Sequence, residues 1–262
     1  MPASDAHGPR VSRTCRSPLS FPGILARIPS STFLGRVARL PLRFIPQRPV
    51  ETIRSGPLRG HHWVVASGVH GYWLGTYEGE MQYAVAHTVA PGGVFFDVGA
   101  HAGYYSLLAA ALVTAAGRVA AFEPDARNIG HLKEHLRLND AGNVAVIEAA
   151  VADRSGHARF APEASGFGGA LSETGAIDVA TVSLDDLVDA GRLPAPHYLK
   201  IDVEGAEFRV LRGARKILEA VRPTIFLAVH DSEAAALCQG ALTALGYAIR
   251  PIARDALVCM PW

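Results

Sequence analysis

The sequence has little cysteine and no long apolar run. Cys15, Cys238 and Cys259 are widely spaced and form no CxxC pair, so neither a disulfide framework nor a zinc knuckle is expected. No apolar stretch approaches the ~20 residues of a membrane-spanning helix. The segment 21–44 is interrupted by arginines and lacks the apolar centre of a signal peptide. These absences favour a reducing, cytoplasmic location.

The chain also has little net charge, but the charge is unevenly distributed. Residues 1–60 hold ten Arg against two acidic residues, or +8, which leaves 1 − 8 = −7 for residues 61–262 of a chain with net charge +1. The acidic part lacks a basic stripe with interleaved aromatics, so we expect no nucleic-acid partner. The basic leader is either a solvated tail or a peripheral contact with an anionic membrane surface.

Composition divides the chain into three parts. Residues 1–20 are rich in Ser, Pro and Arg and are expected to be disordered. Residues 21–75 form an extension with helical and β segments, which would either contact the substrate or a membrane surface or pack on the domain. Short β-like runs are expected at 63–65 and 71–74 and a helix at 78–89. Residues 76–262 form the main domain.

From Gly93 onward, apolar runs alternate with helical segments. Strands are expected at 94–99, 118–124, 143–151, 197–202 and 224–229, helices at 104–117, 125–138, 206–218 and 232–245, and a β-rich insertion at 157–183. This alternation predicts an α/β fold with a mostly parallel sheet and helices on both faces. Ligands of such sheets lie at the carboxyl ends of the strands, here marked by Asp97, Glu123, Asp202 and His230.

The first strand ends in "DVGAHAGYYS", residues 97–106. Gly99 and Gly103 permit a tight turn and a close approach of backbone to a ligand, and the next helix offers free N–H groups. The loop is of a nucleotide-binding type. It is not the dinucleotide fingerprint G-x-G-x-x-G, because His101 and Tyr104 occupy the positions of the second and third glycines.

The second strand ends in Glu123-Pro124. A carboxylate at this place accepts two hydrogen bonds from the 2′- and 3′-hydroxyls of a ribose. Read together with the preceding glycine turn, Glu123 is therefore interpreted as a ribose ligand.

Four segments in this order, "FFDVGAHAGYYS", "AFEPDARN", "LDDLV" and "LKIDVEGAEFRVLRGA", resemble the FkbM-type family of S-adenosylmethionine-dependent methyltransferases. The resemblance extends over residues 76–252, and "KIDVEGAE" is its most specific element. It implies a Rossmann-like class I methyltransferase fold with a seven-stranded sheet, the seventh strand lying beside the fifth. It also implies O-methylation of a sugar, lipid or secondary-metabolite hydroxyl. The sequence departs from the family at His101, where a small polar residue is usual, and at Ala228, where Glu is frequent.

The resemblance implies S-adenosylmethionine as the cofactor. Asp97 would face its ammonium group, directly or through water, and the Gly99 to Gly103 backbone, with His101, would cover its tail and ribose. Adenine would lie among residues of the second and third strand ends, with Asp153 near its amine; the expected cofactor-binding set is Asp97, Gly99, His101, Gly103, Glu123, Pro124, Ala150, Val151 and Asp202.

Methyl transfer to an alcohol is an in-line displacement in which the hydroxyl proton must be removed. Asp202, Glu204 and His230 are the expected catalytic residues, with Glu204 as the group that orients or deprotonates the acceptor and His230 as a base at neutral pH. Glu207 either joins them or serves the positive N-terminus of the next helix.

A divalent metal held by Asp202, Glu204 and Asp231 is an alternative way to activate the acceptor. No spacing in the sequence requires such an ion, and no obligatory metal is expected. The acceptor pocket is expected to use Tyr72, Trp73 and Tyr77, with the glycine-rich segment 163–173 as a mobile lid. Two other functions remain open: a catalytically silent binding module and an NAD-dependent oxidoreductase.

Overall fold

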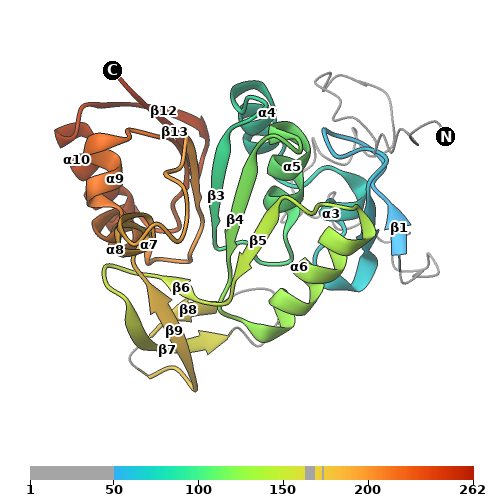
Figure 1. The fold of residues 1–262 in the computed structure, drawn as a ribbon, viewed down its shortest axis with the longest axis horizontal. Helices are drawn as coiled ribbons and strands as arrows, with labels where there is room; N and C mark the ends of the chain where they lie inside the picture. Colours follow the sequence, from blue (N-terminus) through green and yellow to red (C-terminus); the bar gives the residue numbers. More distant parts are fainter. Residues whose placement is uncertain (1–49, 163–168, 173) are drawn as a thin grey trace.

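A seven-stranded sheet forms the centre of the computed structural model, which describes residues 50–162, 169–172 and 174–262 (Figure 1). The strand order is β12-β13-β11-β10-β3-β4-β5. The strands are β3 (Val94–Val98), β4 (Arg118–Phe122), β5 (Val144–Ile147), β10 (Tyr198–Ile201), β11 (Thr224–Ala228), β12 (Tyr247–Ala253) and β13 (Ala256–Pro261).

Six of these strands run in the same direction, and β13 runs antiparallel to them between β11 and β12. Counted along this sheet, the order is 3-2-1-4-5-7-6, with the seventh strand beside the fifth. This confirms the class I methyltransferase fold. The order reverses between β3 and β10, so a crevice opens at the carboxyl ends of these two strands.

Helices cover both faces of the sheet (Figure 1). On one face lie α4 (Gly79–Thr88), α5 (Tyr104–Val113) and α6 (Ala126–Leu138); on the other lie α7 (Leu184–Asp189), α8 (Glu207–Gly213), α9 (Arg215–Ala220) and α10 (Ser232–Ala244). Phe95 packs with the first group and Phe96 with the second. Successive residues of a strand point to opposite faces, so strands buried on both sides are apolar throughout.

Three expected elements differ in detail. The single helix expected at 206–218 is two helices, α8 and α9, with a non-helical Ala214 between them. The β-like run expected at 71–74 is the short helix α3 (Gly71–Leu74), which ends at the left-handed Gly75. The third strand ends at Ile147, and residues 150 and 151 belong to a different sheet.

The described part of the extension, residues 50–75, packs on α5 and α6. It contains the antiparallel pair β1 (Val50–Thr52) and β2 (His62–Val64), the 3-10 turn η2 (Val65–Ser67) and α3. Trp63 is fully buried and stacks on His135 of α6 with ring centroids 3.6 Å apart. These residues share one apolar core with α5, which gives the segment a structural role. The leader 1–20 and residues 21–49 lie outside the described residues.

The β-rich insertion forms a four-stranded sheet of order β6-β9-β7-β8, which projects from the lower edge of the molecule in Figure 1. Its strands are β6 (Ala150–Val151), β7 (Gly156–Pro162), β8 (Gly169–Leu171) and β9 (Ile177–Val182). Of the segment expected to act as a lid, residues 169–171 belong to β8, whereas 163–168 and 173 lie outside the described residues.

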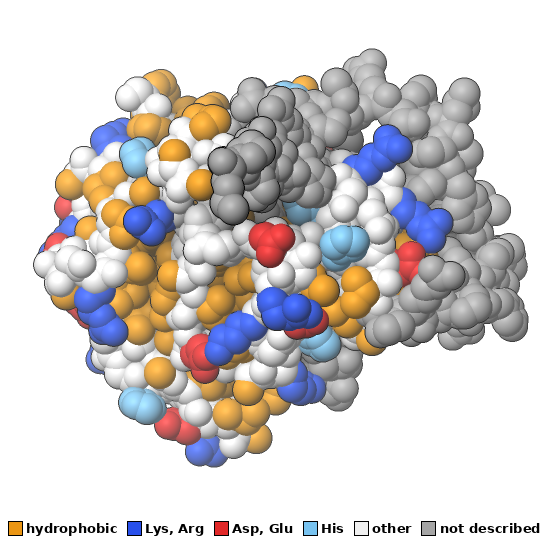
Figure 2. Space-filling model, turned by 45° about the vertical axis from the view of Figure 1, so that its right-hand side comes forward, with side chains coloured by type: hydrophobic (Ala, Val, Ile, Leu, Met, Phe, Trp, Pro, Cys, Tyr) orange, Lys and Arg blue, Asp and Glu red, His pale blue; other side chains and the backbone are white. Residues whose placement is uncertain are grey.

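In the described part of the chain, no helix has both the length and the apolar character needed to cross a membrane. The face shown in Figure 2 carries basic and acidic side chains interspersed with apolar ones.

Candidate active site

A cleft of about 750 Å³, open to solvent, lies at the carboxyl ends of β3, β4 and β10. We divide its surroundings into two parts. The β4 side comprises Gly99, His101, Glu123, Pro124 and Asn128. The β10 side comprises Asp202, Glu204, Glu207 and His230, with Lys200 behind them.

Gly99 brings the ends of β3 and β10 into contact. Its φ is +79°, and a Cβ atom at this position would lie 1.8 Å from the carbonyl oxygen of Asp202. Glycine is therefore required here by close backbone packing as well as by conformation. Gly103 has a similar requirement, because a Cβ atom there would lie 2.3 Å from Leu132.

His101 lines the cleft, and its backbone N–H donates to Glu123. Its Nδ1 lies 3.4 Å from the hydroxyl of Tyr72, and burial lowers its pKa. His101 and Glu204 both line the cleft with φ of +50°, a left-handed conformation that costs a non-glycine residue roughly 1–2 kcal/mol. Strain of this kind concentrates at functional sites.

Glu123 is buried at the end of β4 and lines the cleft. Its carboxylate accepts hydrogen bonds from the backbone N–H of His101 at 2.8 Å and of Asp125 at 2.9 Å. Asn128 lies 3.4 Å from the same carboxylate. Burial raises the pKa of Glu123, and the backbone donors act in the opposite direction. These donors fix the carboxylate at the cleft wall.

Next to Glu123 the wall of the cleft is apolar. The strand ends contribute Phe122, Pro124, Ala150 and Val151, and the insertion contributes Phe160, Gly169 and Leu171. The expected residues Pro124, Ala150 and Val151 are thus brought together. Asp153, expected near an adenine amine, is instead paired with Arg209, with 3.1 Å between Arg209 Nη2 and Asp153 Oδ1.

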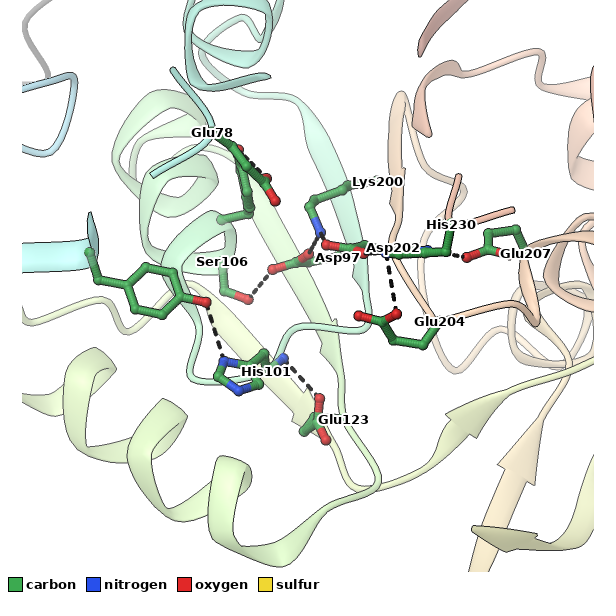
Figure 3. Close-up of polar contacts among 12 residues, drawn as sticks. Glu78, Asp97, His101, Ser106, Glu123, Lys200, Asp202, Glu204, Glu207 and His230 are labelled. Atoms are coloured by element: carbon green, nitrogen blue, oxygen red, sulfur yellow. Dashed lines mark hydrogen bonds and ion pairs between the residues drawn. The ribbon is translucent and has the colours of Figure 1, made fainter. Parts of the chain in front are cut away.

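Strand register brings three charges together behind the cleft. Lys200 on β10 pairs with Asp97 on β3 across the sheet, and Asp202 lies two residues further on the same face. The Lys200 ammonium is 2.9 Å from Asp202 Oδ2 and 3.9 Å from Asp97 Oδ1 (Figure 3). It also lies over the ring of Tyr105. Lys200 is 2% exposed, so this is a buried ion network.

Asp97 points toward α5 rather than into the cleft. It is fully buried and accepts a 2.6 Å hydrogen bond from Ser106 Oγ. Asp97 and Gly103 are not among the described residues that line the cleft. In this arrangement the charged neighbour of Asp97 is Lys200, and the expected contact of Asp97 with a cofactor ammonium stays a prediction.

The charges of the network oppose the effects of burial. Burial raises the pKa of Asp97, although Lys200 lowers it. For Asp202, burial also favours the neutral form, but Lys200 and His230 outweigh it and hold the pKa below its ordinary value. Asp202 therefore keeps its negative charge at the cleft.

His230, after β11, is surrounded by carboxylates (Figure 3). Its Nδ1 is 2.9 Å from Oε1 of Glu207, and its Nε2 is 3.4 Å from Asp202 Oδ1 and 3.5 Å from Glu204 Oε2. The hydrogen bond to Glu207, followed by the charges of Asp202 and Glu204, raises the pKa of His230 to about 9. This contradicts the expectation of a free base at neutral pH, because His230 is an imidazolium there.

Two residues of this site go beyond the sequence prediction: Lys200 was not assigned a role, and Glu207 was left between two roles. Lys200 is the buried counter-ion, and its signal is a lysine inside an otherwise apolar strand. Glu207 is fully buried, and one of its oxygens accepts from His230 Nδ1 and from the backbone of Gly205. Of the aromatic residues expected near an acceptor, Tyr72 and Tyr77 line the cleft, whereas Trp73 is buried and its Nε1 donates to His70.

The strand order, together with a cleft at the switch point, places the protein in the class of Rossmann-like methyltransferases. The model of the methyltransferase FkbM domain matches residues 97–249. The chain belongs to the FkbM methyltransferase family.

A curated relative is the hexuronic acid methyltransferase AglP of Haloferax volcanii, which is 32% identical over 130 residues. The match covers 49% of this chain and 52% of AglP, so it spans about half the length of each protein.

Solved structures with a similar fold include methyltransferase FkbM from Methylobacillus flagellatus KT (19% identity, TM-score 0.48, 74% of this chain and 55% of that chain). Another is precorrin-6y C5,15-methyltransferase from Geobacter metallireducens GS-15 (18% identity, TM-score 0.48, 71% and 89%).

Proposed function

We propose that the protein transfers a methyl group from S-adenosylmethionine to a hydroxyl of a sugar-containing acceptor. The observation that carries this proposal is the polarity of the cleft. It is apolar with one fixed acid, Glu123, at one end and rich in carboxylates, Asp202 and Glu204, at the other. S-adenosylmethionine has the matching order of parts: an adenine, a ribose diol and a cationic tail.

The residues present fit this cofactor. Pro124, Ala150 and Val151 supply an apolar wall for adenine, and Glu123 can accept from a ribose diol because each carboxylate oxygen has more than one acceptor position. Asp202 lines the same cleft and would supply negative charge for the cationic sulfonium of a bound cofactor. The acceptor being a sugar is supported by the name of the relative AglP.

Glu204 is the base that the geometry supports. Its side chain is 48% exposed and lines the cleft, whereas Asp202 is held by Lys200 and His230 carries a proton at neutral pH. As the acceptor oxygen bonds to the methyl carbon, the hydroxyl proton passes to Glu204. When bound, S-adenosylmethionine would supply the methyl group and would retain the electrons of the broken carbon–sulfur bond.

Calorimetric titration with S-adenosylmethionine tests the cofactor site. We expect micromolar binding by the wild type and at least a tenfold weaker affinity in Glu123→Ala, since charge-assisted hydrogen bonds contribute about 1.5–3 kcal/mol. Glu134→Ala is the matched control, because Glu134 is an exposed residue of α6 paired with Arg137. Absence of binding by the wild type would leave the silent binding module, and hydride transfer with added NAD would establish the oxidoreductase.

The acceptor group is tested with labelled methyl transfer to uronic-acid-containing oligosaccharides. A hexuronic acid offers both hydroxyl and carboxyl groups, and the two products differ chemically. A methyl ether survives mild alkali, whereas a methyl ester is hydrolysed. Retention of the label after alkali is expected; its release would replace hydroxyl with carboxyl methylation.

A further inference from the structure

We propose that Asp202, Glu204 and His230 bind a divalent cation that accepts mixed carboxylate and imidazole ligation, such as Mn²⁺. One ligand atom of each residue lies within 4.8 Å of the others. The three residues come from the ends of two neighbouring strands, β10 and β11, and so converge on one point beside the cleft. The proposal departs from the expectation of no obligatory metal.

The distances within this cluster suit metal ligands better than direct ion pairs. His230 Nε2 lies 3.4 Å from Asp202 Oδ1 and 3.5 Å from Glu204 Oε2. Charge-assisted N–H···O hydrogen bonds are usually about 2.7–2.9 Å. Ligand atoms that each lie ~2.1 Å from one octahedrally coordinated ion, the geometry usual for Mn²⁺, are roughly 3.0 Å apart in neighbouring positions and roughly 4.2 Å apart in opposite ones, and the two observed distances lie between these values.

The far side of His230 has the arrangement found behind metal-bound histidines. Its Nδ1 is 2.9 Å from the carboxylate of Glu207, and this partner fixes the ring so that Nε2 is directed at Asp202 and Glu204. Ligating histidines commonly donate their second N–H to such a carboxylate. A cation bound at Nε2 would displace the proton that this nitrogen otherwise carries, because a ligating imidazole is neutral. Glu207 is fully buried, and its Oε2 has no hydrogen-bond partner among the described residues.

The charges near the cluster leave an excess of negative charge for a cation. Four carboxylates lie in or next to the cluster, those of Asp97, Asp202, Glu204 and Glu207. Lys200 pairs with Oδ2 of Asp202 on the side away from the cleft. Oδ1 of Asp202 is left for the cluster. Asp231, the third ligand considered from the sequence, is otherwise engaged, because its side chain caps α10 through the backbone N–H groups of Glu233 and Ala234.

A cation here would lie beside the cleft, since Asp202 and Glu204 also line it. If the proposed methyl transfer is correct, the cation would hold the acceptor hydroxyl and make it more acidic, which is a Lewis-acid role. This role rests on the proposed function, whereas binding of the cation does not.

Electron paramagnetic resonance of Mn²⁺ added to chelator-treated, desalted protein tests the site. We expect the free-ion signal to fall with one ion bound per chain, and the dissociation constant to rise at least tenfold in Glu204→Gln and in His230→Ala. Glu233→Gln, an exposed carboxylate change on α10, should bind as the wild type does. Glu207→Gln should weaken binding roughly tenfold, as loss of an outer partner does.

No loss of free Mn²⁺ signal at millimolar concentration, or equal binding by wild type, Glu204→Gln and His230→Ala, overturns the proposal. Glu204 is half exposed, so Glu204→Gln remains informative should His230→Ala fail to fold. Calorimetry with S-adenosylmethionine separates the two hypotheses. Cofactor binding without Mn²⁺ binding removes the metal site alone, and Mn²⁺ binding without cofactor binding removes the methyl-transfer function.

Discussion

The two sides of the cleft are built by different physical means. On the β4 side, backbone N–H groups hold the one acid, Glu123, and a neutral histidine holds the loop: His135 Nδ1 lies 2.7 Å from the carbonyl oxygen of Ala102. On the β10 side, Asp202, Glu207 and His230 are held by one another and by Lys200. The β4 side is suited to binding an uncharged nucleoside, and the β10 side is suited to a reaction in which charge is redistributed.

This difference predicts different sensitivities. The β10 side is held by buried charges, so removal of one partner should greatly lower the free energy of unfolding, because the remaining buried charge is uncompensated. The β4 side is held by backbone contacts, so its stability should depend on the conformation of the chain and on His135 staying neutral.

The largest effect is expected for Lys200→Met. It leaves Asp97 and Asp202 without their counter-ion, and loss of one member of a buried pair costs about 3–5 kcal/mol. Urea unfolding measures the loss. Lys216→Met is the matched control, since Lys216 is an exposed residue paired with Asp189 and should lose under ~1 kcal/mol. Equal losses in the two variants would show that the β10 side does not depend on its buried lysine.

Gly99→Ala should destabilise the fold by about 2–4 kcal/mol, through a clash with the Asp202 carbonyl and through backbone strain. Gly205→Ala isolates the strain, because Gly205 has φ of +93° with nothing within 4 Å of its added Cβ. It should cost about 1–2 kcal/mol. Thermal unfolding compares the two; a smaller loss at position 99 than at 205 would contradict the close contact of β3 with β10.

Low pH should destabilise the fold at the β4 side, because His135 becomes protonated. Burial lowers the pKa of His135 to about 4, and its Nε2 accepts from the backbone N–H of Val64, which a proton there would prevent. The unfolded chain binds this proton below its ordinary value of 6.5, so stability falls as pH falls from 6.5 toward 4. The loss between pH 7 and 5 is about 2 kcal/mol.

Unfolding of wild type and His135→Gln at both pH values isolates this contribution. Because Gln does not titrate, the variant should lose about 2 kcal/mol less than the wild type on going from pH 7 to 5. Identical losses would show that His135 is not held neutral.

The smallest effect is expected for two helix caps, one on each side. Asp231 caps α10 by accepting from two backbone N–H groups, and Asp125 caps α6 by accepting from the backbone N–H of Arg127. Replacing either by Ala should cost about 1 kcal/mol. Thermal unfolding should give similar values, and Mn²⁺ affinity should stay unchanged in Asp231→Ala. A loss of Mn²⁺ binding there would return Asp231 to the ligand set.

Much of the fold could be predicted because parallel strands buried on both faces are continuous apolar runs. The strands at β3, β4, β10 and β11, and the residues that end them, were found in this way. The division of the third strand between two sheets was not, because "NVAVIEAAV" has the same apolar character throughout. Hydrophobic pattern alone does not decide which sheet a residue joins.

Only part of the candidate site could be predicted from the sequence. Glu123 was found because its position follows from the strand that precedes it. The partners of Asp97 and His230 were missed because they come from pairings between distant segments. Asp97 meets Lys200 through the register of β3 with β10, and His230 meets Glu207 across 23 residues of chain.

The sequence by itself determined the family, the parallel sheet and the edge of the sheet at which the cleft lies, since these depend on local apolar pattern and on short motifs. Tertiary structure alone decided that Asp97 faces a lysine, that His230 is charged and that Asp231 caps a helix. A side chain's charge and role depend on burial and on the groups within a few ångströms, and both are set only when distant strands pair.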